Sequence, residues 1–147
     1  MFFDIDNVDD IELSTDEILW IIKIIQQYVK GLIYVTGCIE SYGDKVKTGL
    51  HLKCPSCIVT YVEAREIRKN IVEALYLDEP DKNWEGIVDN AIYGGSTGIR
   101  MFGSRKTTKG VDKGRVYKLF FVVNEDGEYY KPELSNLELI KALSIHV

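Results

Sequence analysis

Apolar and acidic side chains alternate at the start of the chain, in the segment Met1-Phe2-Phe3-Asp4-Ile5-Asp6. Because successive side chains of a β-strand point to opposite faces, the alternation predicts a strand with Phe3 and Ile5 in a core and with Asp4 and Asp6 side by side on the other face. Two neighbouring carboxylates repel each other unless a cation lies between them, and Mg²⁺ prefers such oxygen ligands. The segment is therefore a candidate metal-binding edge. The plain alternative is a solvated acidic terminus, formed by Asp4, Asp6, Asp9 and Asp10.

The composition restricts the class of protein. A chain of 147 residues with 46% hydrophobic and 28% charged residues is typical of one soluble globular domain, residues 1–147. We expect no membrane span and no signal peptide. Three cysteines imply no disulfide framework, and an intracellular location fits best. The net charge of −5 argues against a surface that is basic throughout, but a local basic groove is indicated by a run of cations: Arg100, Arg105, Lys106, Lys109, Lys113, Arg115 and Lys118.

The first half of the chain alternates between helical and strand signals. A capping box, Ser14 to Glu17, predicts the start of a helix that ends at Gly31. We expect strands over 32–36 and 46–52, separated by turn residues 42–45. A second helix is predicted over 61–77 from its apolar period.

The second half contains more strand than helix. Residues 84–89 return to the core, 93–98 are irregular because they are rich in glycine, and 99–102 form a short strand. The clearest strand is Arg115–Val123, which turns at 124–127 into a hairpin with 128–130. A second capping box, Ser135 to Glu138, opens a last helix that runs to about Ser144. This order predicts an α+β fold with a mixed, largely antiparallel sheet flanked by helices.

Three further segments carry candidate functional residues. On a strand, Lys47, Gly49 and His51 share one face, and the glycine leaves space between a cation and an imidazole, which suits the phosphates of a nucleotide. Asp89 follows two apolar residues and either joins the edge formed by Asp4 and Asp6 or serves as a turn residue. The segment 100–106 contains Arg100, Ser104 and Lys106 close together in sequence. The guanidinium of Arg100 can bind a phosphate through two hydrogen bonds, with the hydroxyl of Ser104 and the ammonium group of Lys106 nearby. The plain alternative for residues 47–51 is a half-exposed strand, and for residues 100–106 it is a basic surface loop.

Together these segments resemble the archaeo-eukaryotic primase superfamily, in particular the primase domain of the helicase–primases of large double-stranded DNA viruses. Phe2-Phe3-Asp4-Ile5-Asp6 is similar to the first family motif, and Gly49-Leu50-His51-Leu52 through Pro55 is similar to the second. Ile87-Val88-Asp89 is similar to the third, an apolar pair and an acid. The segment 98–106, followed by Arg115-Val116-Tyr117, is similar to the Arg-x-x-Gly-Ser-x-Lys motif and the tyrosine-containing strand.

The resemblance implies an RRM-like primase catalytic core that synthesises primers from nucleoside triphosphates on a single-stranded DNA template. It implies that Asp4, Asp6 and Asp89 hold two Mg²⁺ or Mn²⁺ ions. It also implies contacts to the triphosphate from Lys47, Gly49, His51, Arg100, Ser104 and Lys106.

The resemblance carries further expectations about the context of the chain. Gly49 stands where other branches of the superfamily have serine. Family members usually carry a unit before the first motif and a helicase region after the primase domain, so we expect a core or fragment of a longer primase–helicase. A fused or associated replicative helicase is the implied partner, and the implied location is a viral replication site in the host cytoplasm or nucleus.

Three rival interpretations stay open. His51, Cys54 and Cys57 lie at three-residue steps and suggest a zinc site, although a structural site needs four ligands; the ordinary alternative is two semi-buried thiols. The acidic cluster also fits a metal-dependent nuclease. The third rival is a nucleic-acid-binding module of similar fold without catalytic activity.

Overall fold

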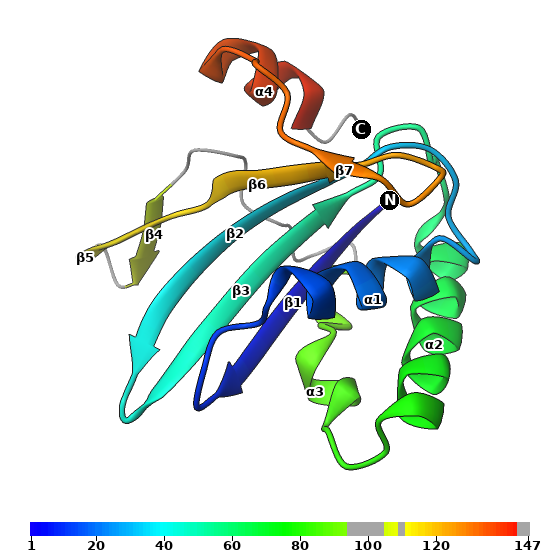
Figure 1. Cartoon of the computed structure of the whole chain (residues 1–147), viewed down its shortest axis with the longest axis horizontal. Coiled ribbons are helices and arrows are strands. Elements are labelled where there is room, and N and C mark those ends of the chain that lie inside the picture. The colour runs from blue at the N-terminus through cyan, green and yellow to red at the C-terminus, as the bar shows by residue number, and fades with distance from the viewer. Residues whose placement is uncertain (94–104, 109–110, 144–147) are drawn as a thin grey trace.

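The computed structural model describes residues 1–93, 105–108 and 111–143, and for 105–108 and 111–115 it describes the backbone alone. Figure 1 shows a curved sheet with helices on either side of it. The strands are β1 (Phe2–Asp9), β2 (Ile33–Tyr42), β3 (Lys45–Lys53), β4 (Arg105–Thr108), β5 (Val111–Val116), β6 (Lys118–Val123) and β7 (Tyr129–Tyr130). The helices are α1 (Thr15–Ile25), α2 (Tyr61–Asp78), α3 (Trp84–Ile87), the 3₁₀ turn η1 (Ala91–Tyr93) and α4 (Asn136–Leu143).

Five strands form the main sheet in the order β1-β3-β2-β6-β7, and β4 and β5 form a separate two-stranded sheet. Every ladder between the described strands is antiparallel. The predicted α+β fold with a largely antiparallel sheet flanked by helices is therefore confirmed. β3 lies between β1 and β2 and pairs with both, so it brings its own residues next to two segments that are distant from each other in the sequence.

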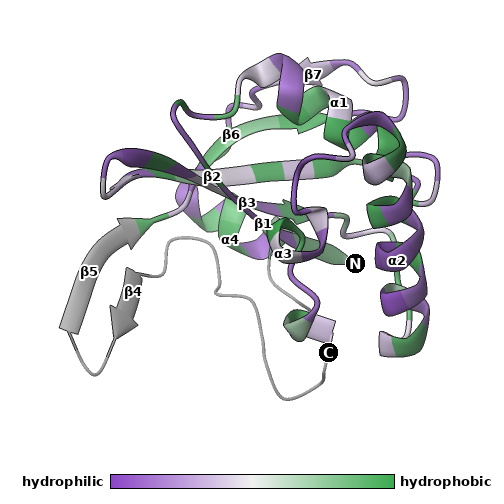
Figure 2. Cartoon of the chain, turned by 90° about the horizontal axis from the view of Figure 1, so that it is seen from below, coloured by the Kyte–Doolittle hydropathy of each residue, from purple (hydrophilic) through white to green (hydrophobic). Residues whose placement is uncertain are grey.

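One face of the sheet carries the main hydrophobic core. Phe3 and Ile5 of β1 are buried there with Leu50 and Leu52 of β3, against α1 and α2. Figure 2 shows hydrophobic and hydrophilic residues alternating along α2, which is the pattern of a helix with one buried face. The same face takes five buried isoleucines of α1: Ile18, Ile21, Ile22, Ile24 and Ile25. The strand alternation that separates Phe3 and Ile5 from Asp4 and Asp6 is as predicted.

The opposite face of the sheet is polar over β1 and β3 and apolar over β6. Leu139 and Leu143 of α4 pack there against Leu119 and Val122. Lys53 of β3 is buried on this face, and its ammonium group donates to the carbonyl of Leu143 at 2.8 Å. Helix α4 therefore covers one end of this face, and the row of polar residues along β1 and β3 continues away from it.

Several local predictions are confirmed within one or two residues. Helix α2 spans Tyr61–Asp78, and the hairpin of β6 and β7 turns at Gly127, which has a φ of +83°. The capping box before α4 makes both of its hydrogen bonds, from the Ser135 N–H to Glu138 Oε2 and from the Glu138 N–H to Ser135 Oγ. Such patterns involve residues close in sequence, which is why they could be predicted.

The predicted end of the first helix at Gly31 is wrong. Helix α1 ends at Ile25, and the side-chain amide of the next residue, Gln26, donates to the carbonyl of Asn124 at 2.8 Å. The next two residues, Gln27 and Tyr28, continue with tighter i→i−3 hydrogen bonds. Gly31 has a φ of +100° in the link to β2. A contact with the distant β6–β7 turn therefore accompanies the early end of the helix.

The predicted single strand Arg115–Val123 is also wrong, because it is two strands. β5 ends at Val116 and pairs with β4, whereas β6 begins at Lys118 and pairs with β2 in the main sheet. Tyr117 lies between them, outside both strands. The predicted strand over 99–102 lies outside the described residues.

None of the helices that the structure describes is long and apolar enough to span a bilayer.

Candidate active site

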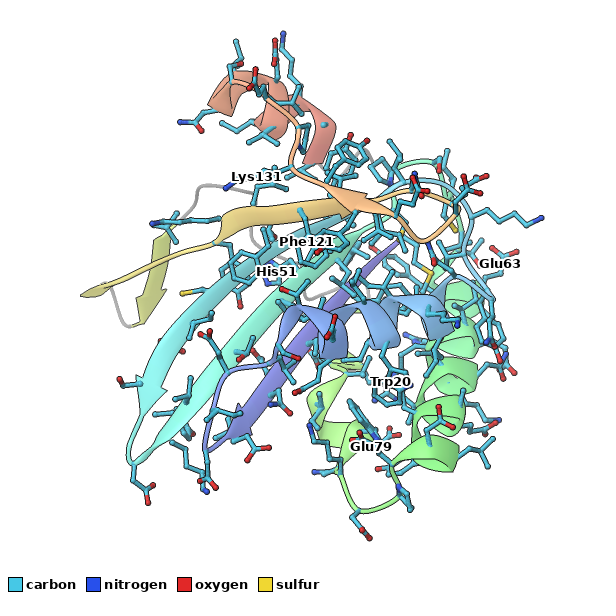
Figure 3. All side chains as sticks on the ribbon, in the orientation of Figure 1. Trp20, His51, Glu63, Glu79, Phe121 and Lys131 are labelled. Atoms are coloured by element: carbon cyan, nitrogen blue, oxygen red, sulfur yellow. The ribbon has the colours of Figure 1, made fainter. Side chains whose placement is uncertain are left out.

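The register between β1 and β3 determines which predicted site residues meet. Asp4 lies opposite His51, Asp6 lies opposite Gly49, and Val8 lies opposite Lys47. Residues directly opposite each other in an antiparallel pair share a face, so both acids lie on the same face as the cation and the imidazole. Figure 3 labels His51, which lies near the middle of the sheet.

Asp4 and Asp6 each have a basic partner on β3. Asp4 Oδ1 is 3.6 Å from His51 Nε2, and Asp6 Oδ1 is 3.5 Å from Lys47 Nζ. These distances are longer than a direct hydrogen bond, so the pairs attract mainly through charge, and the first pair does so only when the imidazole is protonated. The side chain of Asp4 is 20% exposed and that of Asp6 is 39% exposed. The two carboxylates are therefore partly accessible to solvent on the same face of the sheet as their basic partners.

Tyr117 is a site residue that the sequence interpretation did not assign. Its ring stacks on the His51 imidazole, with the centroids 3.9 Å apart and the planes 19° from parallel. A Cβ at Gly49 would lie 2.4 Å from the Tyr117 hydroxyl and 3.2 Å from Asp6 Oδ1. The space that Gly49 leaves is therefore taken by the end of the Tyr117 side chain. Its only sequence signal was its place in the tyrosine-containing segment after Arg115, which looked like an unbroken strand.

The third acid comes from the segment after α3. Val88 forms an antiparallel bridge with Ile5, and the Asp89 N–H donates to the Asp4 carbonyl at 2.9 Å. Asp89 Oδ1 accepts a hydrogen bond from the Ala91 N–H at 2.9 Å. This segment lies along the outer edge of β1, so Asp89 reaches the strand that carries Asp4 and Asp6.

A second contact holds the same segment to β1. The Tyr93 hydroxyl donates to the Phe2 carbonyl at 2.8 Å, and the two rings lie 6.0 Å apart. Burial raises the pKa of Tyr93 well above its ordinary value, so its hydroxyl keeps the proton that it donates. Residues 88–93 are thus anchored to the strand on both sides of Asp4.

The donor chemistry of the three acids fits a hard divalent cation. Asp4, Asp6 and Asp89 offer carboxylate oxygens, the ligands that Mg²⁺ and Mn²⁺ prefer. Within the described ranges, however, no group of three or more His, Cys, Asp or Glu side chains is arranged to hold a metal ion. Asp4 and Asp6 face His51 and Lys47, and Asp89 bonds to the backbone. The metal assignment to these acids remains a prediction.

Two predicted nucleotide-binding residues, Arg100 and Ser104, lie outside the described residues. Lys106 lies in β4, and its side chain is likewise outside the description. β4 pairs with β5, and Arg105 lies opposite Val116, the residue before Tyr117. Of the predicted basic run, Lys118 has a described side chain, and it is exposed.

The cysteines near His51 favour the ordinary alternative over the zinc site. Cys54 is buried in the hydrophobic core, and this burial raises the pKa of its thiol to about 12. A structural zinc site needs four ligands, and within the described residues no group of three or more His, Cys, Asp or Glu side chains could hold a metal ion. Cys57 is half-buried, and both cysteines are free.

A family model described as "C962R protein N-terminal AEP domain" matches residues 1–120, a range that includes every predicted site residue and Tyr117. No curated protein and no solved structure matches the chain.

Proposed function

The chain belongs to the family of C962R N-terminal AEP domains, an archaeo-eukaryotic primase family of large DNA virus proteins, and from this premise we propose that it is a DNA primase. Family membership indicates a primase-like nucleotidyltransferase. The finer proposal is that the chain synthesises primers from nucleoside triphosphates on a single-stranded DNA template. The observation that carries it is the β1–β3 register, which sets Asp4 and Asp6 against His51 and Lys47 on one face.

In this proposal, Asp4, Asp6 and Asp89 hold Mg²⁺ or Mn²⁺. Such an ion, when bound, neutralises phosphate charge and activates a hydroxyl for attack on a phosphate. In this proposal the negative charge of the three carboxylates favours binding of a cation over a neutral ligand. The partly exposed carboxylate of Asp6 is accessible to an ion from solvent.

Lys47 and His51 are proposed to bind the triphosphate. Both lie on β3 next to the acids, and charge-assisted donors bind phosphate oxygens more strongly than neutral donors do. The stack with Tyr117 restricts the orientation of the imidazole, so less freedom is lost when a nucleotide binds. Arg100, Ser104 and Lys106 are proposed, from the resemblance alone, to contact the same phosphates.

The biological context follows from the family and is part of the proposal. Viral DNA replication in the host cytoplasm or nucleus is the setting that we propose. A replicative helicase, fused or associated, is the proposed partner.

The test is nucleotide incorporation on a single-stranded template with Mn²⁺. We expect Asp4→Ala and Asp6→Ala to abolish incorporation while folding, followed by circular dichroism, and template binding survive. The matched control is Asp10→Ala, because Asp10 directly follows β1 and pairs with Lys45 at the surface, at 2.8 Å. Asp10→Ala should incorporate nucleotides at the wild-type rate.

Other outcomes of the same experiment support the rival functions. Cleavage of the template by the wild-type protein, lost in Asp4→Ala, would indicate a nuclease. Template binding by the wild-type protein without any incorporation or cleavage would indicate a binding module. Either result overturns the primase proposal.

A further inference from the structure

Arg68 of α2 is a buried cation that contacts the end of α3. Its side chain is 5% exposed, whereas that of its ionic partner Glu85 is 62% exposed. Arg68 Nη1 lies 2.7 Å from Glu85 Oε1, and Nη2 donates to the Glu85 carbonyl at 2.8 Å. Nε and Nη2 both donate to the Val88 carbonyl, at 3.1 and 2.6 Å. Most of the guanidinium is thus used on backbone carbonyls, because the C-terminal end of a helix presents carbonyls without partners inside the helix.

The carbonyl of Val88 belongs to the same peptide unit as the N–H of Asp89. Arg68 holds the carbonyl side of this unit, and the Asp4 carbonyl accepts the N–H side at 2.9 Å. A peptide unit is planar, so contacts on both of its edges determine its orientation. These contacts therefore hold the backbone nitrogen and Cα of Asp89 beside Asp4, and the Asp89 side chain extends from that fixed point.

We propose that Arg68 is a positioning residue that holds the backbone of Asp89 beside the strand that carries Asp4 and Asp6 and so sets the affinity of the site for a divalent metal ion. The inference rests on the proposed function, because it treats Asp89 as a metal ligand. The planar guanidinium reaches one carbonyl with two donors and a second carbonyl with a third contact, which the single ammonium of lysine cannot reproduce. Groups that orient metal ligands through hydrogen bonds commonly change metal affinity by about 10- to 100-fold when they are replaced.

A purely structural role for Arg68 predicts a different pattern. In that case its replacement loosens α3 in general, and any other lost α2–α3 contact should have a similar effect. The chain offers a matched control in Tyr76, whose hydroxyl accepts a hydrogen bond at 3.1 Å from the Glu85 N–H rather than from the Val88–Asp89 peptide, whose N–H donates to Asp4. Tyr76→Phe removes this contact and keeps the ring.

The experiment measures Mn²⁺ binding directly, without nucleotide, and the Mn²⁺ dependence of nucleotide incorporation. We expect Arg68→Lys to raise the Mn²⁺ concentration at half-saturation about tenfold or more, in line with other ligand-orienting groups. The nucleotide KM at saturating Mn²⁺ should change less than about twofold, and Tyr76→Phe should match the wild type in both. In an Asp89→Ala background, Arg68→Lys should cause no further loss of Mn²⁺ affinity, because the residue through which it acts is gone.

Thermal unfolding of each variant shows whether it is folded at the assay temperature. If Arg68→Lys is not, Arg68→Gln takes its place, because it keeps a planar donor and introduces no buried charge. Unchanged Mn²⁺ affinity in the folded Arg68 variant, equal losses in Tyr76→Phe, or an additive effect with Asp89→Ala overturns the positioning role while the proposed function stands. A wild-type protein that neither binds Mn²⁺ nor incorporates nucleotides overturns the proposed function and this inference with it.

Discussion

The ring of Tyr117 lies on the imidazole of His51, with the two centroids 3.9 Å apart and the ring planes nearly parallel. Tyr117 is the residue at which the chain leaves the two-stranded sheet of β4 and β5 and enters β6 of the main sheet. A residue outside both ladders does not have to follow the side-chain alternation of a strand, and the Tyr117 ring reaches past β2, the neighbour of β6, to His51 on β3. The residue between the two strands thus places an aromatic ring against His51 in the candidate site.

Replacing Tyr117 tests the value of this stack. We expect Tyr117→Leu to raise the nucleotide KM of incorporation by about two- to tenfold, the equivalent of the roughly 0.5–1.5 kcal/mol that an aromatic pair contributes. Tyr117→Phe keeps the stacked ring and should stay close to wild type. Steady-state kinetics at varied nucleotide concentration checks this. Equal effects of the two substitutions would assign the contribution to the hydroxyl rather than to the ring.

Gly49→Ala should destabilise the fold because its Cβ would lie 2.4 Å from the Tyr117 hydroxyl. We expect a loss of about 1–3 kcal/mol in the free energy of unfolding, the usual range for an overpacked site. Because Tyr117→Phe deletes the clashing oxygen, the double variant should recover part of that loss, leaving the 3.3 Å approach of the ring carbon. Urea unfolding of the two single variants and the double variant measures the coupling. An additive double variant would show that the alanine is accommodated elsewhere.

Asp6→Asn should greatly reduce nucleotide incorporation while changing the stability of the fold little. The ion pair of Asp6 with Lys47 is 3.5 Å long and partly exposed, so its loss should change the free energy of unfolding by less than about 1 kcal/mol. Removing one of two neighbouring carboxylates also relieves their repulsion, which offsets part of this loss. Incorporation should nevertheless fall at least about a hundredfold, because a group that acts on charge in the transition state is commonly worth that much. Parallel losses of stability and activity would contradict a catalytic role for Asp6.

The cysteines should differ in reactivity. With a pKa of about 12, Cys54 is thiolate in only about one molecule in ten thousand at pH 8, and the thiolate is the reactive form. We expect iodoacetamide to modify the half-buried Cys38 and Cys57 in the folded protein and to modify Cys54 only after unfolding in urea. Peptide mass spectrometry at timed intervals identifies the modified residues. Rapid modification of Cys54 in the folded protein would show that its thiol is not buried as the structure places it.

Local patterns in the sequence predicted those elements that depend on neighbours along the chain. The Ser135–Glu138 capping box and the period of α2 involve residues three or four apart, and both are found in the structure. The two wrong predictions, the end of α1 and the strand 115–123, fail where a distant segment competes with the local preference. Gln26 contacts Asn124, and Tyr117 contacts His51.

The candidate site divides in the same way. The order of residues by itself determined that Asp4 and Asp6 share a face opposite Phe3 and Ile5, because side-chain direction in a strand repeats every two residues. Only the tertiary structure decided that Asp4 meets His51, that the space at Gly49 belongs to Tyr117, and that the Val88–Asp89 peptide is held by Arg68. These contacts join residues far apart in the chain, so they depend on strand register and helix packing, which no local period encodes.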